Sequence, residues 1–209
     1  MGSAALALVA LLASPASPAA GEAVLGLQRW LDGTRDLEAR FEQALVSSAL
    51  GAGPREAGRI YLRRPGRMRW EYTTPEKKVA LLVDDRTELY LSEERQLHRA
   101  RLRPDDAPLA ALLSGTEPIA SVFVATSLPQ VPGRAGFRLR LVPRRETSGV
   151  EEIVLDLDPE TWAVLGAEVL DAAGNRMAYA FSGLRRNRGI SDALFRFTPP
   201  QGTEIVEGT

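Results

Sequence analysis

The chain has no cysteine and a single histidine, His98, among its 209 residues. Without cysteine there is no disulfide, no thiol nucleophile and no cysteine-ligated metal, and we expect no lipid anchor on an N-terminal cysteine. One histidine excludes a multi-histidine zinc site and disfavours a Ser-His catalytic arrangement. The sequence therefore predicts a protein without a metal site.

Nucleotide-binding and hydrolase motifs are also missing. The chain contains no G-x-G-x-x-G, no G-x-x-x-x-G-K-S/T, no G-x-S-x-G and no H-E-x-x-H. The acidic pairs Asp84-Asp85 and Glu93-Glu94 lie at expected turns, where solvated carboxylates are ordinary. We therefore expect no enzyme and no cofactor, and an enzyme acting on lipids is the least favoured class of function.

The chain has almost no net charge, since it contains 26 Lys and Arg and 27 Asp and Glu. Five arginines between Arg59 and Arg69 alternate with Tyr61 and Trp70, a composition that nucleic-acid-binding faces share. Strand alternation separates most of these arginines from the aromatics, and the neutral chain offers no long-range attraction to a polyanion. No nucleic-acid partner is expected.

The N-terminus is typical of an export signal. Residues 4–13 form an apolar run that is shorter than the roughly 20 residues of a membrane-spanning helix, and Ser, Pro and Ala follow it. Cleavage after Ala19, with Ser17 three positions from the cut, predicts a signal peptide over 1–19 and an exported domain over 20–209. No Lys or Arg precedes the run, so a flexible tail or a different translation start remains the alternative.

Residues 63–72, RRPGRMRWEY, predict a strand, a Pro-Gly turn and a second strand. Alternation along the second strand places Met68, Trp70 and Tyr72 on one face and charged side chains on the other. One face of this hairpin is therefore apolar and the other is solvated.

One helix is predicted before the strands, over residues 22–31, with Gly33 as its stop. Residues 37–45 fit a strand by period two and a helix by period 3.6, and the residues alone favour the helix. Further short strands predict an antiparallel sheet that curls toward a barrel. They are expected at residues 59–63, 67–72, 78–83, 88–91, 137–141, 152–157, 164–170 and 177–181.

Two short apolar helices are predicted within residues 104–130. The first spans 105–113 and begins at an Asp-Asp pair; the second spans 119–128. They would plug the open end of the sheet. Near the C-terminus, residues 182–202, SGLRRNRGISDALFRFTPPQG, predict a strand, an Arg-Asn turn and an aromatic strand that ends at Pro-Pro.

These segments, together with Phe41-Glu42-Gln43 and the arginine of Arg64-Pro65, resemble the outer-membrane lipoprotein carrier (LolA) family over nearly all of the chain after residue 20. The resemblance favours a strand for residues 37–45. It implies a mainly β, α+β single domain: an antiparallel, incomplete β-barrel with a helical lid around an apolar cavity for acyl chains. Such a cavity is needed because each CH₂ moved from hydrocarbon into water costs ~0.8 kcal/mol.

The residues implied at this cavity are apolar positions on the strands and on the lid, although inward apolar residues are also ordinary core. The wall positions are Phe41, Leu62, Met68, Trp70, Tyr72, Leu81, Leu91, Leu139 and Leu155, and the lid positions are Leu109, Leu112, Leu113 and Phe123. By resemblance, Arg64 would latch the lid through backbone carbonyls. The alternative for Arg64 is a solvated surface arginine.

The function implied by the resemblance is that of a periplasmic carrier or chaperone. It would take acylated lipoproteins from an inner-membrane ABC exporter and pass them, as a monomer, to an outer-membrane acceptor lipoprotein. Two alternatives use the same fold: a lipid-sensing regulatory binding module, and a carrier paralogue for another lipid such as a glycolipid or pigment.

Overall fold

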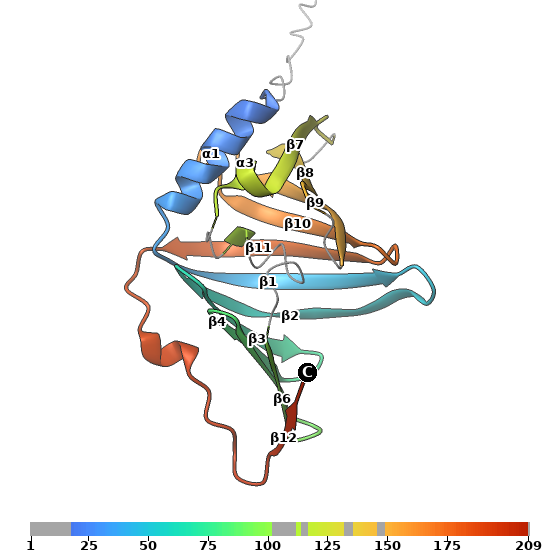
Figure 1. Ribbon diagram of the computed structural model, residues 1–209, viewed down its shortest axis with the longest axis vertical. Coiled ribbons are helices and arrows are strands. Elements are labelled where there is room, and N and C mark those ends of the chain that lie inside the picture. The colour runs from blue at the N-terminus through green and yellow to red at the C-terminus, as the bar shows by residue number, and fades with distance from the viewer. Residues whose placement is uncertain (1–17, 102–111, 114–116, 132–135, 146–148, 209) are drawn as a thin grey trace, which may run out of the picture.

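The computed structural model describes residues 18–101, 112–113, 117–131, 136–145 and 149–208. Within these residues twelve strands form one sheet (Figure 1). The helices are α1 (Ala20–Asp32), α3 (Ile119–Val122) and the 3₁₀ helix η2 (Asp192–Phe195). The strands are β1 (Asp36–Ser47), β2 (Gly51–Arg63), β3 (Arg67–Thr74), β4 (Lys78–Val83), β5 (Arg86–Leu91), β6 (Gln96–Arg101), β7 (Phe123–Leu128), β8 (Phe137–Pro143), β9 (Val150–Leu157), β10 (Val164–Asp171), β11 (Arg176–Arg186) and β12 (Glu204–Glu207).

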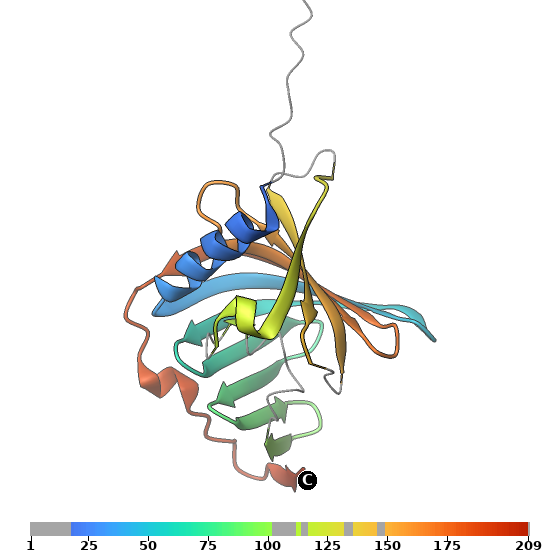
Figure 2. The same cartoon turned by 45° about the horizontal axis from the view of Figure 1, so that its top comes forward.

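The strand order is β12-β6-β5-β4-β3-β2-β1-β11-β10-β9-β8-β7, so β12 and β7 are the two edges. All neighbours are antiparallel except β12, which adds to β6 in parallel. The sheet curves around α1 and α3, as Figure 2 shows. The predicted mainly β, incomplete barrel is confirmed, and the parallel edge strand was not predicted.

Helix α1 confirms the prediction for residues 22–31. Its apolar stripe, which includes Leu27, Trp30 and Leu31, is buried against the concave face of the sheet. The helix ends at Gly33, whose amide donates to the Arg29 carbonyl at 3.0 Å. Among the described residues, no helix has the length and apolarity needed to span a bilayer.

Strand β1 settles the ambiguity of residues 37–45 in favour of period two. Leu37, Ala39, Phe41 and Gln43 are buried on the concave face, and the residues between them face outward. The sheet buries these alternate residues on one side, so no helical stripe is needed.

The second helix predicted in the lid region, over 119–128, is wrong beyond its first turn. Helix α3 stops at Val122, and Phe123 begins β7, which pairs with β8. The helical spacing covered one turn only, and the β-branched Val124 and Thr126 suit a strand. Of the helix predicted over 105–113, Leu112 and Leu113 lie in the described residues and are helical.

The predicted aromatic strand before Pro199-Pro200 is also wrong, because Phe195 ends helix η2 and the following residues are extended without a partner strand in the described part of the chain. This segment crosses the convex face of the sheet. Phe195 is buried there, and the Phe197 ring centroid lies 5.0 Å from that of Tyr90. Residues 196–200 therefore pack through side chains instead of through a backbone ladder.

Arginines of the hairpin at residues 63–72 hold this C-terminal segment in place. Arg63 Nη1 donates to the Ile190 carbonyl at 2.6 Å, and Arg69 Nη1 donates to the Leu194 carbonyl at 3.0 Å. Arg67 binds the carboxylate of Asp192. Arg59 pairs with Glu38 and Arg64 donates to the Leu31 carbonyl, so all five arginines considered for nucleic acid have structural partners.

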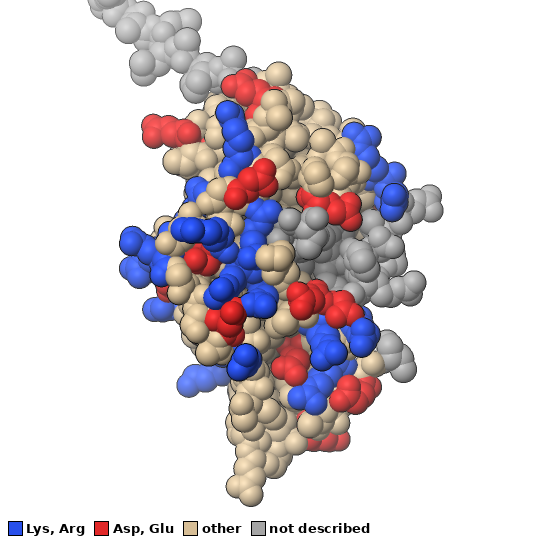
Figure 3. Space-filling view, turned by 60° about the vertical axis from the view of Figure 1, so that its left-hand side comes forward, with Lys and Arg blue, Asp and Glu red and all other residues tan. Residues whose placement is uncertain are grey.

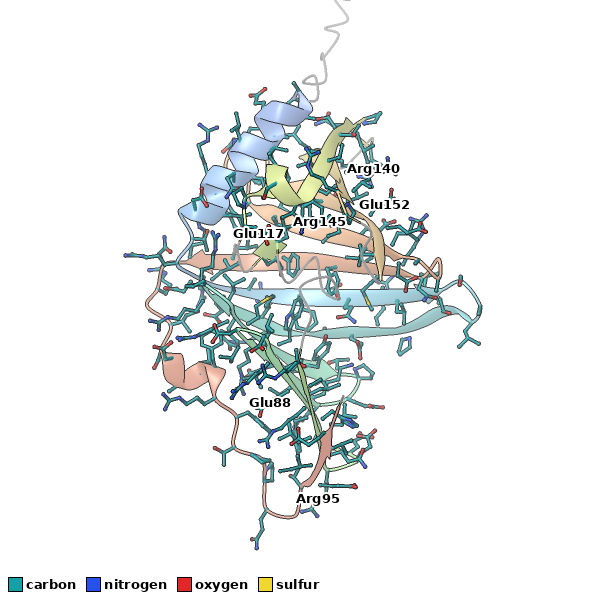
Figure 4. The ribbon with its side chains drawn as sticks, viewed as in Figure 1. Glu88, Arg95, Glu117, Arg140, Arg145 and Glu152 are labelled. Carbon is teal, nitrogen blue, oxygen red and sulfur yellow. The ribbon has the colours of Figure 1, made fainter. Side chains whose placement is uncertain are left out.

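The convex face otherwise carries ion pairs between neighbouring strands. Arg140 of β8 pairs with Glu152 of β9 at 2.5 Å, and Arg99 of β6 pairs with Glu88 of β5 at 2.9 Å; Figure 4 labels three of these side chains, Arg140, Glu152 and Glu88. Positive and negative side chains are interspersed on the face shown in Figure 3. The surface accordingly presents no large field of one sign on that face.

Candidate functional site: the concave apolar face

Five aromatic rings cluster on the concave face of β1, β3 and β11. The Phe41 centroid lies 4.8 Å from that of Trp70 and 5.0 Å from that of Tyr72, both edge to face. Trp70 lies 5.5 Å from Tyr179 and 6.3 Å from Phe181. Such pairs stabilise beyond their buried area, so the cluster is a firm apolar wall.

Gly58 makes this cluster possible. In the sheet it stands between Phe41 of β1 and Tyr72 of β3. A Cβ at position 58 would lie 1.9 Å from the Glu71 carbonyl oxygen and 3.0 Å from the Phe41 ring. The missing side chain leaves the space that the Phe41 ring fills.

A polar network borders the cluster on the side of the β1–β2 turn. The Tyr72 hydroxyl donates to Gln43 Oε1 at 3.0 Å, and Gln43 Nε2 donates to Glu56 Oε2 at 3.1 Å. Lys78 pairs with the same carboxylate and lies 4.3 Å above the Tyr72 ring. Burial raises the pKa of Tyr72 well above its usual value and, with the negative charge of Glu56, raises the pKa of Tyr179 to about 12.

A small apolar pocket lies beside the cluster, beneath α1. Its volume is about 20 Å³, enough for roughly one water molecule and far too small for an acyl chain. The lining side chains come from α1, four strands and the helical residue Leu113, and all are apolar: Trp30, Leu37, Ala39, Ile60, Leu62, Leu113, Val164, Phe181 and Leu184. Among the described residues, α1 and Leu113 cover this pocket, and the pocket by itself could not hold an acyl chain.

Two arginines bind the C-terminal end of α1: Arg64, in the turn after β2, and Arg186, at the end of β11. Arg64 Nη1 donates to the Leu31 carbonyl, and Arg186 Nη2 donates to the Trp30 carbonyl at 3.1 Å while its guanidinium lies 5.1 Å from the Trp30 ring. Burial lowers the pKa of both guanidinium groups, and Asp32 partly opposes this for Arg64. Cations at a helix C-terminus satisfy its last carbonyls and complement the helix dipole.

Asn187 completes this attachment and confirms the predicted Arg-Asn turn. Its backbone is left-handed, with φ of 57°, and its side chain donates to the Gly33 carbonyl at 2.9 Å. The same side chain accepts from the Arg35 amide at 2.8 Å. The C-terminal end of α1 is thus fixed to the sheet by side chains far apart in sequence.

The structure brings most of the predicted wall residues to the concave face. Phe41, Leu62 and Met68 are buried there, and Trp70 and Tyr72 are partly buried. Leu139 and Leu155 are fully buried in the half of the sheet near α1, in the position of core residues. Leu91 shares the face through its pairing with Lys78 but lies outside the main core cluster.

Leu81 does not belong to this wall, and its assignment is corrected. The register pairs Leu81 with Arg69 and Glu88, whose side chains face the convex side. Strand β4 is apolar on both faces because the C-terminal segment covers its convex side, so alternation alone could not fix which face Leu81 occupies.

The predicted lid residues are placed as follows. Leu112 and Leu113 are buried in the main core cluster, and Leu113 lines the pocket. Phe123 is buried at the start of β7, a strand, so it belongs to the wall. Leu109 lies outside the described residues.

Arg64 donates to the carbonyl of Leu31 in α1, and its predicted contacts with lid carbonyls stay a prediction, because most of the predicted lid lies outside the described residues. Helix α1 covers the concave face, so the contact still joins the sheet to a cover over the site. The latch role itself stays a prediction.

Sequence reasoning missed several residues at this site. Tyr179 and Phe181 belong to the aromatic cluster, and Trp30 and Ile60 line the pocket. The signal for the first two was present, since residues 177–181 alternate large and small side chains, and the strand was predicted without its inward face being assigned.

Known proteins resemble this chain along most of its length. Residues 32–198 match the profile of the outer membrane lipoprotein carrier protein LolA family. An outer-membrane lipoprotein carrier protein of Dechloromonas aromatica is 30% identical over 188 residues, covering 88% of this chain and 87% of that protein. One of Chromobacterium violaceum is 28% identical over 209 residues, covering 97% and 96%.

A solved structure shares the fold. The crystal structure of an uncharacterized conserved protein from Thermus thermophilus superposes with a TM-score of 0.55 at 15% identity, covering 90% of this chain and 99% of that one. At this identity the likeness concerns the fold alone.

Proposed function

Because the chain belongs to the outer membrane lipoprotein carrier protein LolA family, we propose that it carries lipoproteins by enclosing their acyl chains against the concave face of its sheet. The observation that carries this proposal is the aromatic wall of Phe41, Trp70, Tyr72, Tyr179 and Phe181 next to an apolar pocket beneath α1. Binding needs no catalytic group, which agrees with a family of carriers.

We expect the residues that cover the pocket beneath α1 to move on loading. Because this pocket of about 20 Å³ is too small for an acyl chain, α1 and Leu113 would shift away from the sheet when cargo enters there. Each CH₂ transferred from water to the exposed wall returns ~0.8 kcal/mol, which offsets the contacts that α1 loses. Arg64 and Arg186, at the C-terminal end of α1, set how readily the helix shifts.

The cellular setting follows from the same proposal. We place the carrier in the periplasm, with its signal peptide cleaved after Ala19. It would act as a monomer between an inner-membrane ABC lipoprotein exporter and an outer-membrane acceptor lipoprotein. In this role it is a chaperone for cargo and has no enzymatic activity.

Mass spectrometry of the material that co-purifies from the periplasm tests the proposal. We expect triacylated lipoproteins in complex with the protein. A free lipid without protein would instead favour the lipid-sensing module or a paralogue for another lipid. Recovery of the natively expressed protein in the cytoplasm with an intact N-terminus would contradict the carrier function.

Photo-crosslinking locates the cargo on the protein. Leu62 and Tyr61 are neighbours on β2 that face opposite sides of the sheet, with Leu62 on the concave side. A photoreactive residue at position 62 should capture lipoprotein, and one at position 61 should not. Equal capture at both positions would mean that cargo does not occupy the concave face.

A further inference from the structure

The β1–β2 hairpin ends in an exposed apolar tip. Leu50 is 90% exposed, Val46 46% and Leu45 37%. The hairpin extends past the neighbouring strand ends at that side of the sheet, away from α1 (Figures 1 and 2). Large apolar side chains gathered at a projecting tip mark a contact surface.

The tip has no charge. The eleven residues 44–54 contain no Asp, Glu, Lys or Arg, although a quarter of the chain is charged. Flanking cations lie behind the tip, at Arg55 and at Arg176, which pairs with Glu168 at 2.6 Å. The tip therefore has no charged side chain with which to bind a partner through ion pairs.

Local hydrogen bonds fix the shape of the tip and satisfy its polar groups. Ser47 Oγ accepts from the amides of Ala49 and Leu50, each at 3.3 Å. The Ser48 amide donates to Asn175 Oδ1 at 3.1 Å, and its hydroxyl donates to a carbonyl of the β10–β11 turn at 2.7 Å. Backbone groups that are already bonded enter an apolar phase at much lower cost.

From this geometry we infer that the tip formed by residues 45–50 inserts reversibly into the interfacial region of a phospholipid bilayer. A single convex hairpin offers far less than the roughly 800 Å² per partner of a stable protein interface. A bilayer needs no complementary pocket and accepts side chains such as Leu50 in any arrangement. One turn with few apolar side chains gives weak, transient attachment.

The tip also continues into the candidate site. Along β1, Leu45, Gln43 and Phe41 lie on the same face, and they pair with Met177, Tyr179 and Phe181 of β11. Membrane contact would bring the border of the aromatic cluster next to the bilayer. Insertion of the tip into a bilayer is proposed for the cargo-free protein, so it can be tested independently of the proposed carrier function.

Vesicle flotation of the mature, cargo-free chain tests the inference with vesicles of phosphatidylethanolamine and phosphatidylglycerol. Leu50→Asp should lower the bound fraction by about tenfold, the equivalent of one buried leucine. Leu25→Asp, on the surface of α1 where Leu25 is 64% exposed, is the matched control and should float like the unchanged protein. Binding should persist in about 0.5 M salt, because the tip is uncharged. Equal flotation of the two variants, or no flotation of the unchanged protein, would overturn the inference.

Absence of native cysteine allows a direct readout of depth. An environment-sensitive fluorophore attached to Leu50→Cys should brighten when vesicles are added, and the same fluorophore on Leu25→Cys should not. Sedimentation velocity without vesicles tests the alternative that the tip binds a second copy of the chain. If a dimer forms and Leu50→Asp abolishes it while flotation is unchanged, the tip is a protein contact and the membrane assignment is wrong.

Discussion

Replacing Arg64 with leucine tests whether the attachment of α1 to the sheet controls loading. Arg64 donates a charge-assisted hydrogen bond to the Leu31 carbonyl from a side chain that is 12% exposed. Such a bond contributes about 1.5–3 kcal/mol. The ion pair with Asp32 adds little, because its atoms are 4.0 Å apart and the carboxylate is mostly exposed.

Arg64→Leu removes this bond from the closed, empty state. If loading displaces α1, the loaded state loses nothing, so affinity for a fluorescent triacylated lipopeptide should rise by about 10- to 150-fold. Release to acceptor vesicles should slow correspondingly. Arg186 still binds the Trp30 carbonyl, so the empty protein should remain folded, with its unfolding free energy lowered by no more than the same amount.

Arg67→Leu is the control, because Arg67 lies on the same hairpin but binds Asp192 on the convex face. Its effect on lipopeptide affinity should be small. Equal effects of the two substitutions, or loss of binding in Arg64→Leu, would refute the latch and leave Arg64 as a structural residue.

Three further outcomes are expected. Gly58→Ala should lower the unfolding free energy in urea by about 1–3 kcal/mol through overpacking, whereas Gly21→Ala, where nothing lies within 4 Å of the added Cβ, should not. The pKa of Tyr179 is raised to about 12, so its hydroxyl stays neutral in the folded protein, whereas in the unfolded chain it ionises near pH 10. The unfolding free energy should therefore fall between about pH 10 and 12. It should fall less in Tyr179→Phe, as measured by denaturant unfolding at a series of pH values. With single-tryptophan variants, Trp70 fluorescence should shift to the blue when lipopeptide is added, and Trp162 should respond less; an equal response would remove Trp70 from the site.

The strands that could be predicted are those whose two faces differ chemically. Residues 67–72 alternate between charged and apolar side chains, and the structure places their apolar members together. Residues 78–83 end at turns and match β4 in both bounds. Local pattern was enough wherever one side of the sheet meets solvent.

Prediction failed where the local sequence pattern carried no information about which distant strand or side chain a segment packs against. The first half of β2, residues 51–58, contains glycine, alanine and proline without alternation, and it is a strand because β1 pairs with it. Leu81 lies in a strand that is covered on both faces. Phe195 and Phe197 pack on a distant part of the sheet, which no local periodicity can reveal.

The C-terminal segment has a mechanical consequence for the wall that it backs. Residues 190–197 cross the outside of β3–β5, where arginines and Phe195 fasten them, and β12 extends the sheet beyond β6. Because this segment packs against the convex face of β3–β5, we expect this half of the sheet to resist bending outward. We therefore expect added internal volume to come from the opposite side, where α1 lifts once its C-terminal end is released from Arg64, Arg186 and Asn187.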